Sequence, residues 1–236
     1  MNHPDQNKQD VSLDERKQAR LFFCSIPFYF AVPLLIWFFL ENLGAAFFWK
    51  AFFLGALGWI VALFLRGPIH AWGQKLPQKT AMFLVGLSSG PLEEGVRLAL
   101  LLLTGTSFSW ALSLGQGWAA IEVLYVVING VILVTVLRKN DEKSREVKKI
   151  LESQGTSRLS PFWGLSERLF ASLFHIGATL MIARSPSWVF LLLVVHSAFN
   201  LGAVWLSRRN MFWAQLLIAI VGTVVFVAGL AMFNHL

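Results

Sequence analysis

The chain has little charge and almost no cysteine. Only 14% of its 236 residues are charged, whereas soluble domains carry roughly 25%. A single cysteine, Cys24, excludes an intramolecular disulfide and a metal cluster built on cysteines. Apolar residues instead make up 56% of the sequence. We therefore expect an integral membrane protein rather than a soluble domain.

Seven apolar runs are each long enough to cross a bilayer, which takes about 20 residues. The first run has no small-residue cleavage site at its end, so we expect it to be retained. We predict an all-α membrane protein in which seven transmembrane helices surround a buried polar active site. A polar cytoplasmic segment, residues 1–20, precedes one transmembrane domain over 21–236. The predicted spans are 21–40, 47–65, 80–103, 110–137, 165–183, 188–206 and 213–233.

The formal net charge of +7 follows the connections between spans rather than one binding face. Basic residues precede the first span and follow the second, fourth and sixth, among them Arg66, Lys79 and Arg208. This positive-inside pattern predicts a cytoplasmic N-terminus and a C-terminus outside, in a bacterial cytoplasmic membrane. The charge therefore indicates contact with the lipid bilayer and no nucleic acid. In the connector 138–160 we predict a short amphipathic helix, with a solvated linker as the alternative.

The third span contains an ionisable cluster, Glu93, Glu94 and Arg97. Each such residue costs roughly 2.5–3.5 kcal/mol on insertion into a bilayer, so the cluster indicates function. Arg97 lies on the same helical face as either acid and pairs with one of them, which leaves a carboxylate over to act as a base. Pro91 predicts that the helix kinks or restarts there, with both acids in the first turn of a half-helix.

Further polar residues lie at similar depth in later spans. Glu122 follows Gly115-Gln116-Gly117-Trp118, which allows close helix approach, and we expect it to act in the site or to support it. His175 lies in the fifth span. His196 and Asn200 share one face of the sixth because they are four residues apart. From separate helices these side chains can converge on one pocket.

A carboxylate and a histidine around one water form a general-base pair. A second histidine and an asparagine can donate hydrogen bonds to a developing oxyanion. The sequence contains no Gly-x-Ser-x-Gly and no His-Glu-x-x-His, so it lacks the signatures of serine hydrolases and conventional zinc proteases. These residues favour peptide-bond hydrolysis by an activated water.

The three motifs Glu93-Glu94-x-x-Arg97, His175 and His196-x-x-x-Asn200 resemble those of the CPBP superfamily of intramembrane glutamic proteases, most closely its YhfC branch, which is related to PrsW. The resemblance implies a protease that cleaves a membrane protein or peptide. It assigns water activation to Glu93 and His175, the oxyanion site to His196 and Asn200, and orientation of the glutamates to Arg97.

The spacing differs from that of the CAAX proteases in this group, in which the arginine stands one residue later. Their phenylalanine four residues before the histidine is Ala171 here. The resemblance therefore does not imply a CAAX substrate, and it leaves open which of Glu93 and Glu94 faces the water.

Several alternatives remain at this point. We expect no cofactor, but Glu93, His175 and His196 could instead hold Zn²⁺ and leave one position open, although Arg97 would oppose a dication. A proton-coupled transporter also places acids and histidines beside a broken helix. The remaining alternatives are a haem protein, with the two histidines as axial ligands, and a catalytically silent homologue. The sequence indicates no oligomeric state.

Overall fold

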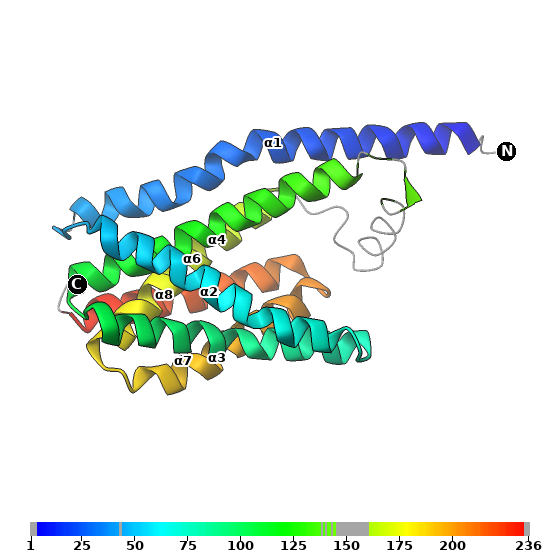
Figure 1. Cartoon of the computed structure of the whole chain (residues 1–236). Helices are drawn as coiled ribbons and strands as arrows, with labels where there is room; N and C mark the ends of the chain where they lie inside the picture. The colour runs from blue at the N-terminus through cyan, green and yellow to red at the C-terminus, as the bar shows by residue number, and fades with distance from the viewer. Residues whose placement is uncertain are drawn as a thin grey trace.

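The structure, a computed structural model, describes residues 4–42, 44–137, 139, 141–142, 144 and 161–233. This part of the chain forms seven helices and no strand, which confirms the all-α prediction (Figure 1). The amphipathic helix predicted over 141–154 lies largely outside the described residues. The helices are α1 (Pro4–Asn42), α2 (Trp49–Gly73), α3 (Gln78–Thr104), α4 (Phe108–Leu137), α6 (Pro161–Arg184), α7 (Trp188–Ser207) and α8 (Met211–Ala231).

Two helices extend beyond the predicted spans. The polar segment before residue 21 continues the helix of the first span, so that α1 is one helix from Pro4. Helix α2 reaches Gly73 instead of ending near residue 65, which places Arg66 inside it. Hydropathy marks where side chains become polar, whereas the helical backbone can continue past that point.

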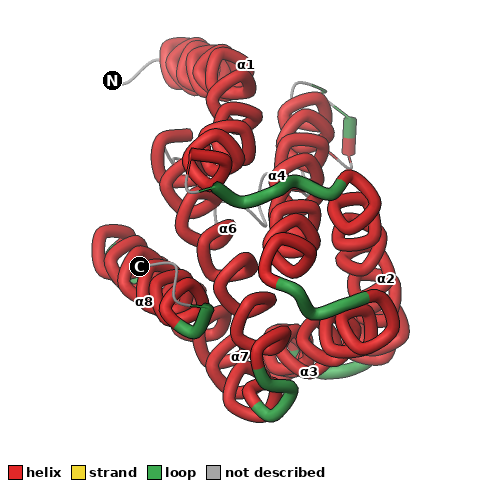
Figure 2. Tube along the Cα trace, turned by 90° about the vertical axis from the view of Figure 1, so that its left-hand side faces the viewer, coloured by secondary structure: helices red, strands yellow, loops and turns green. Residues whose placement is uncertain are grey.

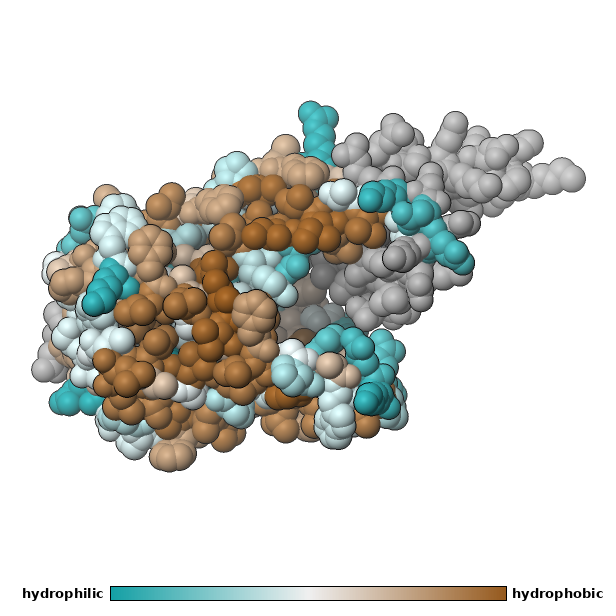
Figure 3. All heavy atoms as spheres, in the orientation of Figure 1, coloured by the Kyte–Doolittle hydropathy of each residue, from teal (hydrophilic) through white to brown (hydrophobic). Residues whose placement is uncertain are grey.

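Among the described residues, five helices are long and apolar enough to cross a membrane: α2, α4, α7, α8 and the Lys17–Asn42 part of α1. Figure 3 shows apolar residues over most of the visible face, and exposed side chains such as Phe53, Leu57 and Phe64 extend along α2. The chain is thus a helical membrane protein. Helices α3 and α6 do not qualify by composition because they carry the ionisable residues, so the seven-span topology stays a prediction.

Six helices form a closed ring in the order α2, α3, α7, α8, α6 and α4, and each packs on the next. Helix α1 lies outside this ring against α4 and α6 (Figure 2). The α2–α3 and α7–α8 connections lie at the end of the bundle that holds the N-terminus, and the C-terminus lies at the other end (Figure 1). This alternation agrees with the predicted topology, whereas the side of the membrane stays a prediction.

Two glycines of α4 bring this helix close to both of its ring neighbours. A Cβ at Gly117 would lie 1.8 Å from the Phe52 carbonyl oxygen of α2, and a Cβ at Gly115 would lie 2.9 Å from Ile176 of α6. Only glycine allows such an approach. The predicted close contacts are therefore confirmed, and they hold α4 against the helices that face it across the site.

Helix α3 continues through Pro91, so the predicted restart of the helix is wrong. Proline cannot donate the hydrogen bond that the Leu87 carbonyl would normally accept. The Ser197 hydroxyl of α7 donates to that carbonyl instead, at 2.7 Å. Gly90 permits the approach, since a Cβ there would lie 2.1 Å from the Leu193 carbonyl oxygen. A neighbouring helix thus compensates for the proline.

This compensation predicts a background-dependent effect of Ser197→Ala. In the parent protein the substitution leaves the Leu87 carbonyl without its partner and should lower the free energy of unfolding by about 1–3 kcal/mol. In a Pro91→Ala background the restored N–H bonds to Leu87, so the same change should have a small effect. Unfolding of the four proteins in detergent measures the coupling. Equal losses in both backgrounds would contradict the role assigned to Ser197.

Candidate functional site

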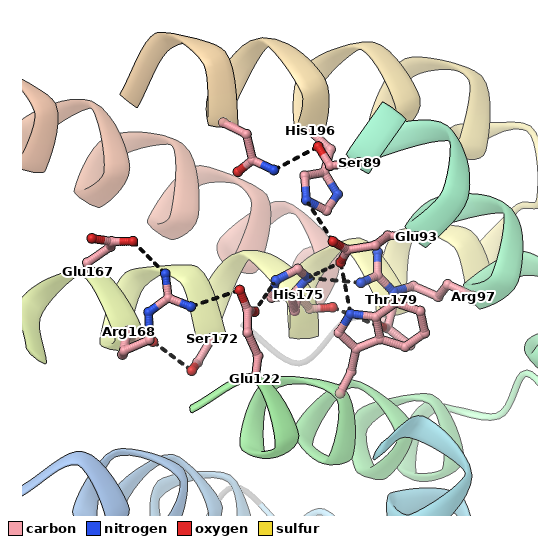
Figure 4. Close-up of polar contacts among 12 residues, drawn as sticks. Ser89, Glu93, Arg97, Glu122, Glu167, Arg168, Ser172, His175, Thr179 and His196 are labelled. Carbon is pink, nitrogen blue, oxygen red and sulfur yellow. Dashed lines mark hydrogen bonds and ion pairs between the residues drawn. The ribbon is translucent and has the colours of Figure 1, made fainter. Parts of the chain in front are cut away.

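A cluster of ionisable side chains lies inside the ring of helices (Figure 4). Its deepest members are almost fully buried, with 4% or less of Glu93, Glu94, Arg97, His175 and His196 exposed. The structure brings together all of the predicted site residues except Asn200. The cluster consists of Arg66 from α2, Glu93, Glu94 and Arg97 from α3, Trp118 and Glu122 from α4, Arg168 and His175 from α6, and His196 from α7.

Glu94 and Arg97 form a fully buried ion pair on α3. Arg97 Nη1 donates to Glu94 Oε2, and the guanidinium lies 4.4 Å from the centre of the Trp118 ring, a favourable cation–π position. The other oxygen of Glu94 lies 2.6 Å from His196 Nδ1. Arg97 therefore neutralises Glu94, and Glu94 in turn fixes the orientation of His196.

Glu93 has its own cation. Arg66 Nη2 donates to Glu93 Oε1, and Trp118 Nε1 donates to Glu93 Oε2 at 3.1 Å. The interpretation that one carboxylate remains without a cation is therefore wrong. Sequence reasoning missed Arg66 because it placed that residue in a cytoplasmic connection, and it considered Trp118 only as part of a close helix contact.

Both ring nitrogens of His175 have partners. Arg97 Nη2 lies 2.9 Å from His175 Nδ1, and Glu122 Oε2 lies 2.7 Å from Nε2. Because a guanidinium only donates hydrogen bonds, Nδ1 accepts, and the ring proton sits on Nε2 and is donated to Glu122. Glu122 therefore contacts the site through His175, and its predicted role, in the site or in support of it, stays a prediction.

A row of alternating charges continues from Glu122 toward the N-terminal end of α6. Arg168 lies 2.8 Å from Glu122 and 2.5 Å from Glu167. Side-chain exposure is 42% for Glu167, 20% for Glu122 and 4% for His175. Polar groups therefore connect the site with the more exposed end of this row, toward the end of the bundle that holds the N-terminus.

At the centre, Glu93 lies between the two histidines. His175 Nδ1 is 3.9 Å from Glu93 Oε2, and His196 Nε2 is 3.8 Å from Glu93 Oε1. One ligand atom from each of the three residues lies within 4.8 Å of the others. Since His196 Nδ1 donates to Glu94, the lone pair of the neutral ring is on Nε2 and faces Glu93. A small species among these atoms would touch all three.

Asn200 lies one helical turn from His196 on α7 and outside this central group. Its amide donates to the Ser89 hydroxyl of α3 at 2.8 Å, and the residue lines a cavity at the end of the bundle. The prediction that His196 and Asn200 share a helical face is consistent with this placement. In the described conformation, however, the amide of Asn200 links α3 to α7 and is directed at Ser89.

The donor set of Glu93, His175 and His196 is one that zinc accepts. The outer nitrogen of each histidine also contacts a carboxylate, as it does in metal sites. However, the atoms that would bind the metal already receive hydrogen bonds, His175 Nδ1 from Arg97 and Glu93 from Arg66 and Trp118. Zinc at these atoms would have to displace Arg97 from His175 Nδ1.

A haem between the two histidines does not fit this arrangement. Its porphyrin would need the space between His175 and His196. The carboxylate of Glu93 lies within 3.9 Å of a nitrogen of each ring in that space, and the ring centres are 5.4 Å apart in an edge-to-face arrangement. We therefore set the haem alternative aside.

Comparison of the chain with known protein families, with curated proteins and with solved structures finds no match. The resemblance to intramembrane glutamic proteases therefore stays an expectation that rests on three short motifs.

The buried ion pair predicts unequal costs for single and double substitutions. Arg97→Gln leaves the carboxylate of Glu94 buried without its cation, and removal of one partner from such a pair typically costs 3–5 kcal/mol of stability. Adding Glu94→Gln removes the uncompensated charge, so the double variant should be more stable than Arg97→Gln alone. Unfolding in detergent measures both, with Arg20→Gln as an exposed arginine control. A double variant less stable than the single one would contradict this account.

Proposed function

We propose that the chain is an intramembrane endopeptidase that hydrolyses a peptide bond of a membrane-associated protein or peptide. One observation carries the proposal. The buried carboxylate of Glu93 lies within 3.9 Å of a ring nitrogen of both His175 and His196, an arrangement suited to holding and deprotonating one water molecule.

In the proposed reaction Glu93 takes a proton from a water that also contacts His196 Nε2. The resulting hydroxide attacks the carbonyl carbon of the substrate and forms a tetrahedral oxyanion. As the C–N bond breaks, the proton held on Glu93 passes to the leaving nitrogen, which departs as an amine. The second product is a carboxylic acid, so one water is consumed for each bond cleaved.

The hydrogen bonds support different roles for the two glutamates. Glu94 is fully buried and binds Arg97 through one oxygen and His196 through the other, so we assign it the positioning of His196. Glu93 faces both histidines, so we assign it the role of the base. His175, held by Arg97 and Glu122, forms the opposite wall of the water site.

Arg66 is suited to stabilise the oxyanion. Its side chain is 21% exposed, more than any group that contacts Glu93 directly in the described cluster, and its Nε is buried without a hydrogen-bond partner. When Glu93 becomes protonated its attraction for the guanidinium falls, and Arg66 can turn toward the carbonyl oxygen of the substrate. The resemblance gives this role to Asn200, which would first have to release Ser89.

A proton-coupled transporter is the main alternative from another class. Such proteins commonly bind their ions where a membrane helix is broken, and the sequence suggested a break at Pro91. Because α3 is continuous there, the feature that most favoured a transporter is removed. The charged cluster itself is compatible with either function, so the two must be separated by experiment.

The first test measures cleavage of membrane-anchored fluorogenic peptides by protein reconstituted in liposomes. Glu93→Gln keeps the size of the side chain but removes the base, so we expect cleavage to fall by at least about a hundredfold. His175→Ala and His196→Ala should also lose most activity because each forms a wall of the water site. Arg66→Gln should lower kcat more than it raises KM, since the donor acts on the oxyanion.

Glu41→Gln is the matched control, since it makes the same chemical change at an exposed position in the last turn of α1, outside the ionisable cluster. It should cleave at the rate of the parent. Equal cleavage by Glu93→Gln and the parent would overturn the role of Glu93. Absence of cleavage together with a proton-coupled flux that Glu93→Gln abolishes would replace the protease by a transporter.

A zinc-dependent form of the same protease is the second candidate, favoured by the carboxylates that contact both histidines. We expect the purified protein to contain zinc well below one ion per chain, and a chelator should leave cleavage unchanged, because Arg97 occupies His175 Nδ1. Elemental analysis and activity after chelation check both points. Stoichiometric zinc, with activity lost on chelation and restored by Zn²⁺, would establish the metal mechanism instead.

A further inference from the structure

The cavity that Asn200 lines has a volume of about 880 Å³ and lies at the end of the bundle where α2 leads into α3. Its volume is in the range typical of small-molecule sites. None of the residues described above as the centre of the site lines it. Its walls come from the last turn of α2, the first half of α3 and the second half of α7 with the residue after it, Arg208.

The cavity has a polar mouth and an apolar interior. Helices α3 and α7 run antiparallel beside each other, and both Figures 1 and 2 show them adjacent. Along α3 the lining runs from Gln78 at the mouth to Gly86, a length of roughly 12 Å at the rise of an α-helix. Along α7 the same length separates Arg208 from Asn200. Between these ends the walls are mainly apolar, as at Phe83 and Val204.

The charge at the mouth is positive. Lys79 and Arg208 line it, and the lining set contains no acidic residue. Within the described chain no carboxylate pairs with either of them, and Arg208 Nη2 donates only to the Met82 sulfur, at 3.3 Å. Sulfur is a weak acceptor, so an anionic oxygen would bind this guanidinium more strongly.

We propose that this cavity binds one anionic phospholipid. The phosphate lies between Lys79 and Arg208, the amides of Gln74 and Gln78 bind the remaining polar groups of the head, and the upper part of an acyl chain lies along Phe83, Val85 and Val204. The basic connections of the bundle are at this end, and the leaflet that they face is the one richer in anionic lipid. The proposal goes beyond peptide hydrolysis and does not depend on it.

The inner end of the cavity gives the lipid a structural consequence. Asn200 and Gly86 close that end, and Asn200 donates to Ser89, one turn before Glu93 on α3. A bound lipid therefore contacts the residues that join α3 to α7 just below the ionisable cluster. Its binding should stabilise the contact between these two helices.

Native mass spectrometry of the full chain, purified in mild detergent, measures the retention of added phosphatidylglycerol against phosphatidylcholine. We expect one phosphatidylglycerol to be retained preferentially, and Lys79→Ala/Arg208→Ala to weaken its binding by about tenfold or more. Arg20→Ala/Lys75→Ala removes the same charge from exposed positions outside the cavity and should bind as the parent does. Lys79→Arg/Arg208→Lys keeps the charge and should retain binding, which separates loss of binding from loss of folding.

If Lys79→Ala/Arg208→Ala and Arg20→Ala/Lys75→Ala lose phosphatidylglycerol binding equally, the lipid is held by general surface attraction and the proposal is overturned. Equal retention of the two lipids would overturn it as well. If an acidic membrane-anchored peptide binds in the cavity and no phosphatidylglycerol is retained, the cavity would be assigned to a peptide instead. A Val204→Trp variant that fills the apolar wall should lower phosphatidylglycerol retention while leaving the charge unchanged, and unchanged retention would contradict the proposed position of the acyl chain.

Discussion

Burial of charge is the constraint on which the interior of this protein depends. Three inner carboxylates, Glu93, Glu94 and Glu122, each contact an arginine, Arg66, Arg97 and Arg168 respectively. In a medium of low dielectric an unpaired charge costs several kcal/mol, so each group must have a partner close by. The pairs of Glu93 and Glu122 join α2 to α3 and α4 to α6, whereas the pair of Glu94 lies within α3. Replacing one member of a pair by an apolar side chain would leave its partner as an unpaired buried charge.

The same pairing limits what the site can do before a substrate arrives. A carboxylate that accepts hydrogen bonds from Arg66 and Trp118 is held in place by two neighbouring helices. In the proposed reaction the water adds a third hydrogen bond to this carboxylate, and one of the two donors leaves once Glu93 has taken the proton. Arg66 is the donor that can leave at least cost because its side chain is partly exposed, whereas Trp118 is fully buried. A peptide carbonyl would then accept the hydrogen bond that Arg66 releases.

Sequence reasoning predicted the helices and most of the cluster because few alternatives exist for charge in an apolar run. Glu93, Arg97, His175 and His196 were each too costly to face lipid and had to meet inside. Helical periodicity predicts which face of a helix a side chain lies on, and it predicted that Asn200 shares a face with His196. It does not predict which residue of a neighbouring helix the side chain contacts, so the hydrogen bond from the Asn200 amide to Ser89 could not be predicted. It could not find Arg66 either, because the end of α2 is set by tertiary contacts rather than by hydropathy. The effect of Pro91 depended on Ser197, a residue of another helix.

The pairing of α3 with α7 joins these observations. Three residues of α7 bind α3 in succession: His196 contacts Glu94, Ser197 donates to the Leu87 carbonyl, and Asn200 donates to Ser89. Gly90 permits the short distance on which all three contacts depend. A change in the separation of these helices would therefore alter both the orientation of His196 and the inner wall of the cavity that Asn200 lines. The α3–α7 interface forms part of the cavity and also positions His196 beside Glu93. A lipid that binds more tightly at one separation of α3 and α7 than at another would therefore be thermodynamically coupled to the geometry around Glu93.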